Sequence, residues 1–222
     1  MLKKLLLAIF LAAMPAGAQS LEQQVYDAGV VVFQEFSDGQ ILPICSGTAV
    51  ERGTESYLIL SAGHCVAGVD QNGQTILYGA RLFVGPTIDP ALISEAIVIS
   101  VGNLKSGKDY AILLTKPKVQ FMPLAISSAS ISLEDEVLIA GAPLGLGKFL
   151  LRGYVAATYM ELETPWPEGF LMQVSDIAGG SSGSGVVCKE TGKICGIVVG
   201  MFRNGTAIAL PVRDFKAWVY GQ

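Results

Sequence analysis

The sequence of 222 residues holds a single histidine, and its four cysteines include no CxxC pair. Zinc sites are built mainly from histidine and cysteine ligands at short spacings, so we expect no metal centre and no other cofactor. Lysine and arginine total 15 against 19 acidic residues, and no basic cluster occurs beyond residue 4. Nucleic-acid surfaces need clustered positive charge, so that class of partner is excluded as well.

Apolar runs long enough to cross a membrane are also missing. The apolar run at the start, residues 5–14, is about half as long as a spanning helix. Two lysines precede it and Ala16-Gly17-Ala18 follows it, which is the pattern of a secretory signal peptide. We predict that residues 1–18 are removed by cleavage between Ala18 and Gln19. The mature chain is then exported, to the periplasm or outside the cell, with no membrane anchor.

The cysteines fit that destination, because disulfides persist in oxidising compartments. Four cysteines can pair in three ways. Cys188 and Cys195 flank a short turn between two apolar runs and are predicted to close a hairpin. That pairing leaves Cys45 with Cys65.

Short strand-like segments dominate the mature chain. The first set covers residues 29–36, 57–60, 97–101 and 111–114, and the second covers 136–140, 153–158, 170–174, 185–187, 194–199 and 207–210. The segment 115–132, with two prolines and four serines, separates the two sets. Only residues 212–220 are predicted to be helical. This spacing predicts an all-β sandwich or barrel architecture in two halves.

Three segments hold residues suited to nucleophilic catalysis. Residues 179–185 consist only of glycine and serine. Glycine allows backbone N–H groups to point into a concavity, and a serine there is a candidate nucleophile. His64 is the only base of the usual kind. Asp109 precedes an apolar run and would hold an imidazole in one tautomer. Taken singly, these features also fit a flexible linker, a structural histidine and a turn residue.

Together the three segments resemble the motifs of trypsin-like serine proteases of the chymotrypsin fold. Ser61-Ala-Gly-His-Cys65 is similar to the histidine motif of that family. Asp109-Tyr-Ala-Ile-Leu-Leu114 is similar to its aspartate motif, and Gly180-Ser-Ser-Gly-Ser184 to its nucleophile motif. The resemblance spans about residues 28–215.

The resemblance implies a role for each residue. Ser182 would be the nucleophile, His64 the base and Asp109 the acid that orients it. The N–H groups of Gly180 and Ser182 would form the oxyanion hole, and Ser184 is the alternative nucleophile. The expected partner is a polypeptide substrate. Two other functions remain open: a catalytically inactive binding module and an esterase on the same fold.

The fold that the resemblance implies is all-β, with two packed antiparallel six-stranded β-barrels at about residues 26–118 and 130–212. A C-terminal helix at about 212–220 completes a single domain over residues 19–222. Cys45-Ser-Gly-Thr-Ala49 is similar to the family strand whose cysteine bridges to the cysteine beside the histidine, which also favours the pair Cys45–Cys65.

The order of residues separates this family from the α/β-hydrolases. Gly179-Gly-Ser-Ser-Gly183 also fits the G-x-S-x-G nucleophile elbow. That fold needs its histidine after the serine, whereas His64 precedes Ser181. The all-β pattern excludes that fold as well.

Ser181 departs from the trypsin pattern, because trypsin and chymotrypsin have an aspartate there that pairs with a newly cleaved N-terminus. A neutral serine predicts activity without a defined new N-terminus, with loop 141–147 ordering the oxyanion hole instead. Residues 19–27 remain candidates for a short propeptide. The chain is instead more similar to bacterial members of the family, such as glutamyl endopeptidases and the protease domain of the high-temperature-requirement proteases. Residues 140–146 and 205–211 resemble segments of the high-temperature-requirement proteases.

Two residues are candidates for the specificity pocket. Asp176, just before the nucleophile motif, would favour Arg or Lys before the scissile bond. Met201 would lie on the opposite pocket wall and favour an apolar residue. Glutamyl specificity usually needs a second histidine, which the chain lacks.

Overall fold

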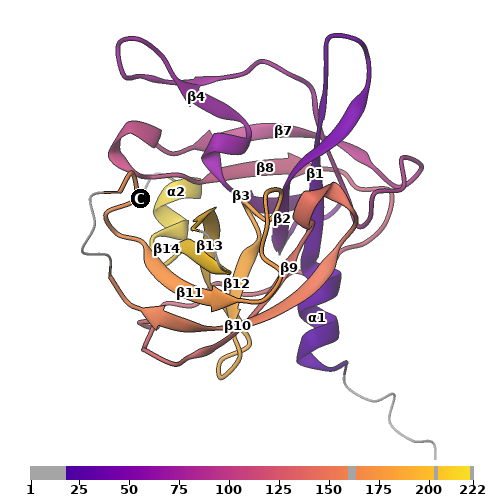
Figure 1. Cartoon of the computed structure of the whole chain (residues 1–222). Coiled ribbons are helices and arrows are strands. Elements are labelled where there is room, and N and C mark those ends of the chain that lie inside the picture. Colours follow the sequence, from indigo (N-terminus) through magenta and orange to yellow (C-terminus); the bar gives the residue numbers. More distant parts are fainter. Residues whose placement is uncertain (1–18, 160–163, 203–204, 221–222) are drawn as a thin grey trace, which may run out of the picture.

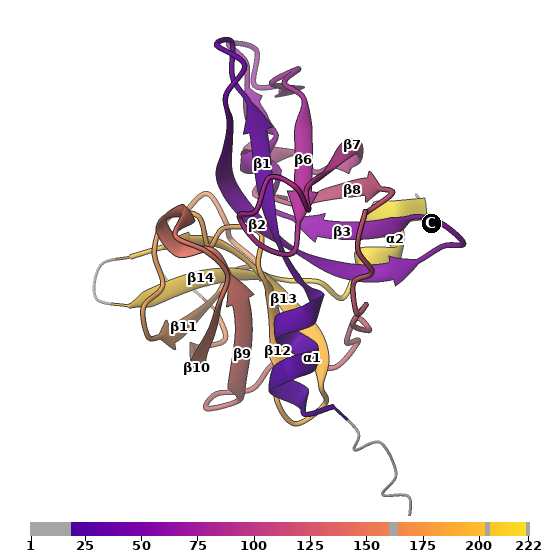
Figure 2. The same cartoon turned by 90° about the vertical axis from the view of Figure 1, so that its right-hand side faces the viewer.

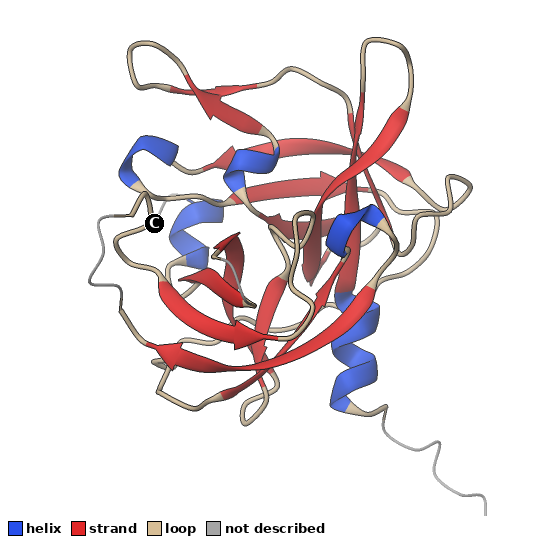
Figure 3. Ribbon diagram, in the orientation of Figure 1, coloured by secondary structure: helices blue, strands red, loops and turns tan. Residues whose placement is uncertain are grey.

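The computed structural model describes residues 19–159, 164–202 and 205–220 (Figure 1). The predicted signal peptide, residues 1–18, lies outside these ranges. Within them, no helix has the length and apolar character needed to span a bilayer. Strands account for far more of the chain than helices do (Figure 3).

The first half of the chain forms a closed antiparallel barrel of six strands. In spatial order these are β1 (Gly29–Glu35), β2 (Ile41–Arg52), β3 (Tyr57–Ser61), β8 (Ala111–Thr115), β7 (Ser94–Val101) and β6 (Leu82–Gly85). Pairing of β1 with β6 closes the ring. A separate two-stranded sheet of β4 (Ala67–Val69) and β5 (Thr75–Leu77) lies beside this barrel at the top of Figure 1.

The second half forms another closed antiparallel six-stranded barrel. Its spatial order is β10 (Phe149–Ala157), β11 (Phe170–Val174), β14 (Thr206–Pro211), β13 (Lys193–Met201), β12 (Gly185–Cys188) and β9 (Glu136–Gly141). A disulfide between Cys188 and Cys195 joins the hairpin of β12 and β13, the pairing predicted for these two cysteines. The two barrels and the C-terminal helix confirm the predicted fold class.

Aliphatic and aromatic side chains fill both barrels and the layer between them. The largest fully buried ones include Ile59, Leu60, Ile112 and Leu113 in the first barrel and Leu138, Ile139, Phe170 and Met172 in the second. One continuous apolar cluster contains residues of both barrels. Burial of this shared surface holds the barrels against each other, because each fully buried large aliphatic side chain contributes about 1.5–3 kcal/mol.

The C-terminal helix α2 (Phe215–Tyr220) belongs to the second half of the chain but docks on the first barrel. The Trp218 carbonyl accepts a hydrogen bond of 2.8 Å from the Ser100 hydroxyl in β7. The helix begins at Phe215 rather than at the predicted residue 212. Val212 still belongs to the strand layer, because its N–H donates to the Cys195 carbonyl.

The residues ahead of the first barrel form a helix that the sequence analysis did not predict, α1 (Leu21–Ala28). Ser20 caps its start and accepts a hydrogen bond from the Gln23 N–H. The helix packs on β9 and β10, and its Val25 and Ala28 side chains are buried. In Figure 2 the helix lies below β1, at the side of the second barrel. The prediction of a single helix at 212–220 is therefore wrong. The apolar face of α1 is too narrow to produce a clear helical period.

Candidate active site

His64 and Asp109 meet where two neighbouring strands of the first barrel end. His64 lies in the short 3-10 turn η1 (Gly63–Cys65) after β3, and Asp109 lies just before β8. The two strands pair antiparallel, with Ser61 opposite Ala111. This register alone brings the segments that carry the imidazole and the carboxylate to the same end of the barrel.

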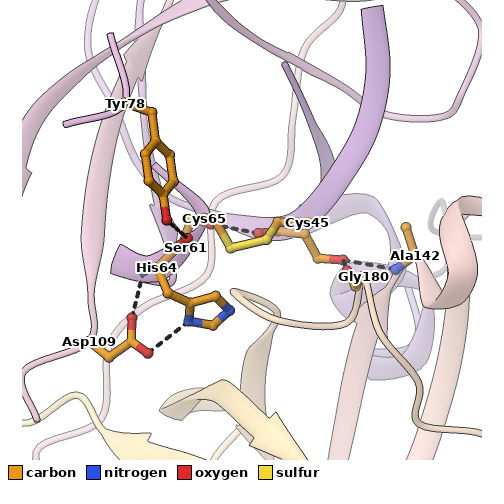
Figure 4. The surroundings of a disulfide bond; sticks show 9 residues. Cys45, Ser61, His64, Cys65, Tyr78, Asp109, Ala142 and Gly180 are labelled. Carbon is orange, nitrogen blue, oxygen red and sulfur yellow. Dashed lines mark hydrogen bonds and ion pairs between the residues drawn. A yellow bond between two sulfur atoms is a disulfide. The ribbon is translucent and has the colours of Figure 1, made fainter. Parts of the chain in front are cut away.

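The carboxylate of Asp109 holds His64 at two points (Figure 4). Its Oδ2 lies 2.7 Å from the His64 Nδ1, and its Oδ1 accepts a hydrogen bond of 2.8 Å from the His64 backbone N–H. Asp109 is only 3% exposed. A carboxylate acceptor at Nδ1 places the ring proton there and leaves Nε2 free to accept a proton. In this arrangement the Nε2 of His64 can serve as a general base.

The disulfide between Cys45 and Cys65 fastens the histidine turn to β2 (Figure 4). It is the second pairing predicted for the four cysteines. Cys45, His64 and Cys65 also form the one cluster of metal-ligating residue types among the described residues. Both sulfur atoms of that cluster are used in the disulfide, so the cluster is explained by the covalent bond.

The serine segment of the second barrel lies directly against the histidine segment of the first. The Ser46 N–H donates to the Ser182 carbonyl at 2.8 Å, and the Gly183 N–H donates to the Val198 carbonyl at 2.7 Å. A Cβ atom on Gly183 would lie 2.2 Å from the Ser46 carbonyl oxygen and 2.9 Å from the Ala62 nitrogen. Only glycine, here with a φ of 87°, allows this close approach.

The structure thus brings Ser182 to the site, with its residue half-buried. Both Ser182 and His64 belong to the described residues, and the Ser182 hydroxyl makes no hydrogen bond to His64. Such contacts are often long in unliganded enzymes and shorten when substrate binds. Ser184 is fully buried, and a Cβ atom on Gly141 would lie 2.6 Å from its hydroxyl oxygen. Of the two serines, only Ser182 is accessible to a substrate.

The loop after β9 orders the serine segment, as expected for residues 141–147. The Leu144 N–H in η3 (Pro143–Gly145) donates to the Gly179 carbonyl at 2.6 Å. The buried Ser46 hydroxyl donates to the Gly180 carbonyl at 2.7 Å and accepts from the Ala142 N–H at 2.8 Å (Figure 4). These bonds fix the peptide planes on both sides of Gly180.

The N–H groups of Gly180 and Ser182 donate to no acceptor among the described residues. Gly180 has a φ of 93°, a conformation that favours glycine. Two free backbone donors beside a serine are what an oxyanion hole requires. Ser181 is buried, and none of the described residues places a charged partner against its hydroxyl.

The two candidate specificity residues lie on the surface. Asp176 is exposed and has a φ of 60°, which is the geometry of a turn. Met201 lies at the end of β13 and is 48% exposed. No described contact joins them, so the expected residue preferences stay predictions.

Sequence reasoning missed two residues that act on this site. Ser46 ties the first barrel to the serine segment through its hydroxyl and its N–H, while its carbonyl accepts from the Ser61 hydroxyl within the first barrel. Trp166 donates from its indole Nε1 to the Asp109 Oδ2 at 3.0 Å. Ser46 lies within the Cys45 motif and was open to recognition there. Nothing near Trp166 in the sequence indicates its contact with a residue of the other barrel.

Comparison with known proteins gives a family and a fold. A family model described as a trypsin-like peptidase domain matches residues 45–197. Rv3671c from M. tuberculosis H37Rv, solved as an inactive form of a serine-to-alanine mutant, aligns with a TM-score of 0.64 and 16% identity, over 93% of this chain and 95% of that one. A serine endoprotease from Yersinia pestis aligns with a TM-score of 0.66 and 22% identity, over 93% of this chain and 69% of the chain of that protease. A search of the curated proteins finds no match.

Proposed function

Because the chain belongs to the family of trypsin-like peptidase domains, we propose that it is an exported serine endopeptidase with Ser182 as its nucleophile. The observation that carries this proposal is the double hydrogen bond between Asp109 and His64, formed beside a serine segment with two free N–H groups. A solved structure of the same fold is a serine endoprotease, which supports the assignment.

The proposed reaction proceeds through an acyl-enzyme. The Ser182 hydroxyl attacks the carbonyl carbon of a peptide bond while the His64 Nε2 takes its proton. The N–H groups of Gly180 and Ser182 hold the negative oxygen of the tetrahedral intermediate, and Asp109 stabilises the imidazolium. The intermediate collapses as His64 gives the proton to the leaving amine. Water, activated by the same histidine, then hydrolyses the ester and restores Ser182.

Export is part of the proposal. The apolar segment 5–14 and the small residues before Gln19 support a cleaved signal peptide. The two disulfides support an oxidising destination, since they persist in the periplasm and outside the cell.

Hydrolysis of a denatured protein and of a matched peptide ester tests the function. We expect the wild-type chain to cleave both, and we expect His64→Ala and Ser182→Ala to cleave neither. Cleavage of the ester alone would indicate an esterase. Failure of the wild-type chain on both, together with measurable binding of peptides, would indicate an inactive binding module.

A further inference from the structure

The buried carboxylate of Asp109 has a third hydrogen bond besides the two from His64. Its Oδ2 accepts from the His64 Nδ1 and also from the Trp166 Nε1, at 2.7 and 3.0 Å. We propose that Trp166 is a positioning residue of the active site, whose indole N–H holds Asp109 in the orientation that His64 needs. The proposal rests on the catalytic roles proposed above for those two residues.

The chain around Trp166 is built to hold the indole in place. The Thr164 hydroxyl accepts from the Trp166 N–H at 3.2 Å, and the Gly169 N–H donates to the Trp166 carbonyl at 3.0 Å. Prolines at 165 and 167 flank the tryptophan and restrict its backbone. The side chain therefore projects from a stiff turn.

This turn packs on the segment that carries Asp109. A Cβ atom on Gly107 would lie 2.4 Å from the Pro165 carbonyl oxygen and 2.7 Å from the Pro167 Cδ. Gly107 also has a φ of 77°. Both features require glycine there, and they let the turn from the second barrel sit against the backbone of the first, two residues before Asp109.

A second glycine makes room for the indole ring itself. A Cβ atom on Gly200, in β13, would lie 2.9 Å from the Cη2 and 3.0 Å from the Cζ3 of Trp166. The ring is thus seated against a strand of the second barrel while its N–H reaches a carboxylate of the first. The indole bridges the two barrels at the acid of the triad.

The chemistry of the carboxylate explains why this bond matters. A buried carboxylate loses its hydration, so each of its oxygen atoms needs donors from the protein. Oδ1 accepts a hydrogen bond from the His64 backbone N–H, and Oδ2 accepts from both the His64 Nδ1 and the indole Nε1 of Trp166. Without the indole donor, the negative charge of the Asp109 carboxylate would interact more strongly with the imidazole. The carboxylate would also be freer to rotate.

The single histidine allows a direct test, because its ring resonances in an NMR spectrum have one possible assignment. Trp166→Phe keeps an aromatic side chain at this position and removes the N–H donor. With the indole gone, the imidazolium is stabilised more strongly, so the midpoint of the His64 ring titration should rise by about 0.5 pH. Loosened geometry should slow labelling by a fluorophosphonate about tenfold. Asp109 is the one charged side chain bonded to the ring among the described residues.

Trp218→Phe is the matched control. Trp218 is the other tryptophan of the chain and stacks on Tyr110, with ring centroids 4.2 Å apart, without bonding to Asp109. The Trp218→Phe substitution should leave the His64 titration unchanged. If Trp166→Phe does not fold, Gly200→Ala is the second variant. It retains Trp166 but pushes the indole ring away from its place, so we expect the same rise in the midpoint of the His64 titration.

An unchanged His64 titration in a folded Trp166→Phe or Gly200→Ala protein would overturn the proposal and leave Trp166 a packing residue. The titration requires no substrate, so it separates this proposal from the proposed function. A shifted titration in a protein that never reacts with the fluorophosphonate would support the role of Trp166 and contradict the peptidase assignment.

Discussion

The hydroxyl of Ser46 lies at the centre of the hydrogen bonds that shape the proposed oxyanion hole. It joins the Ala142 N–H in the loop after β9 to the Gly180 carbonyl in the serine segment. The residue itself belongs to β2 of the first barrel and is fully buried. One side chain thus connects three segments that are distant in the sequence.

Ser46→Ala should remove this connection and leave two buried backbone groups without partners. We expect the free energy of unfolding to fall by about 1–3 kcal/mol. We also expect the rate of fluorophosphonate labelling to fall at least about tenfold, because the donors of the oxyanion hole lose their support. Urea unfolding and labelling kinetics measure the two effects.

Ser61→Ala is the control for this variant. The Ser61 hydroxyl is also buried and donates to the Ser46 carbonyl, but it does not touch Gly180 or Ala142. It should lower stability by a similar amount and affect labelling less. Equal labelling rates in the two variants would show that the Ser46 hydroxyl has no specific role.

At the scale of single residues, the sequence predicts those site residues that lie within a short local motif. His64, Asp109 and Ser182 each lie in a short recognisable segment. The contact of Trp166 with Asp109 spans 57 residues and depends on how two barrels dock. No local pattern encodes such a contact, so only the structure could find it.

Helix α1 and the start of β1 contact Lys148, the residue that follows loop 141–147. The Lys148 Nζ donates to the Gly29 carbonyl at 2.9 Å and lies 4.4 Å from the centroid of the Tyr26 ring. Burial lowers the pKa of Lys148 to about 8, although the charge of Asp27 partly opposes this. Lys148 is half-buried and lies just after loop 141–147, so it connects the N-terminal helix to the end of that loop.

This lowered pKa predicts a stability that rises with pH. Between about pH 8 and pH 10.5 the unfolded chain binds more protons at Lys148 than the folded chain does. The free energy of unfolding of the wild type should therefore increase relative to that of Lys148→Met across this window. Urea unfolding of both proteins at pH 7.5, 9 and 10.5 measures the difference.

Lys189→Met should behave differently, because the exposed Lys189 pairs with Glu136 and its pKa is raised. The contribution of this ion pair to the free energy of unfolding is complete below the ordinary pKa of lysine and is lost only at higher pH. A constant difference between the wild type and Lys148→Met from pH 7.5 to 10.5 would contradict the account of Lys148.

The N-terminal helix also defines a prediction about activation. Chains that begin at Gln19, or one residue earlier, should label equally fast, because Ser181 needs no charged partner. A chain that begins at Ala28 lacks the packing of Val25 and should lose about 2 kcal/mol of stability. Labelling kinetics and unfolding of the three chains test this. Activity confined to one sharply defined start would restore an N-terminal insertion mechanism.

At the scale of elements, most apolar runs bounded by turn residues were predictable, whereas the short strands β4, β5 and β6 were not. The runs at 111–114 and 136–140 were predicted and belong to β8 and β9. β4 and β5 have three residues each, and β6 has four. Elements this short are stabilised by their neighbours rather than by their own sequence pattern, so propensity does not reveal them.

At the scale of the molecule, the site belongs to neither barrel alone. The first barrel supplies the histidine and the aspartate, and the second supplies the serine and the glycines that approach it. Hydrogen bonds across the junction include Ser46 N–H to Ser182 carbonyl and Gly185 N–H to Thr48 hydroxyl, both at 2.8 Å. The family resemblance predicted this division of roles, whereas the interbarrel bonds required the structure.

Labelling with a fluorophosphonate, followed by mass mapping of the modified peptide, identifies the nucleophile directly. We expect one phosphonyl group on Ser182, loss of the label in Ser182→Ala, and retention in Ser184→Ala, because Ser184 is buried. His64→Ala should label far more slowly, since the base that takes the serine proton is gone. A label on Ser184, or an undiminished label in a folded Ser182→Ala protein, would contradict the assignment of Ser182 as the nucleophile.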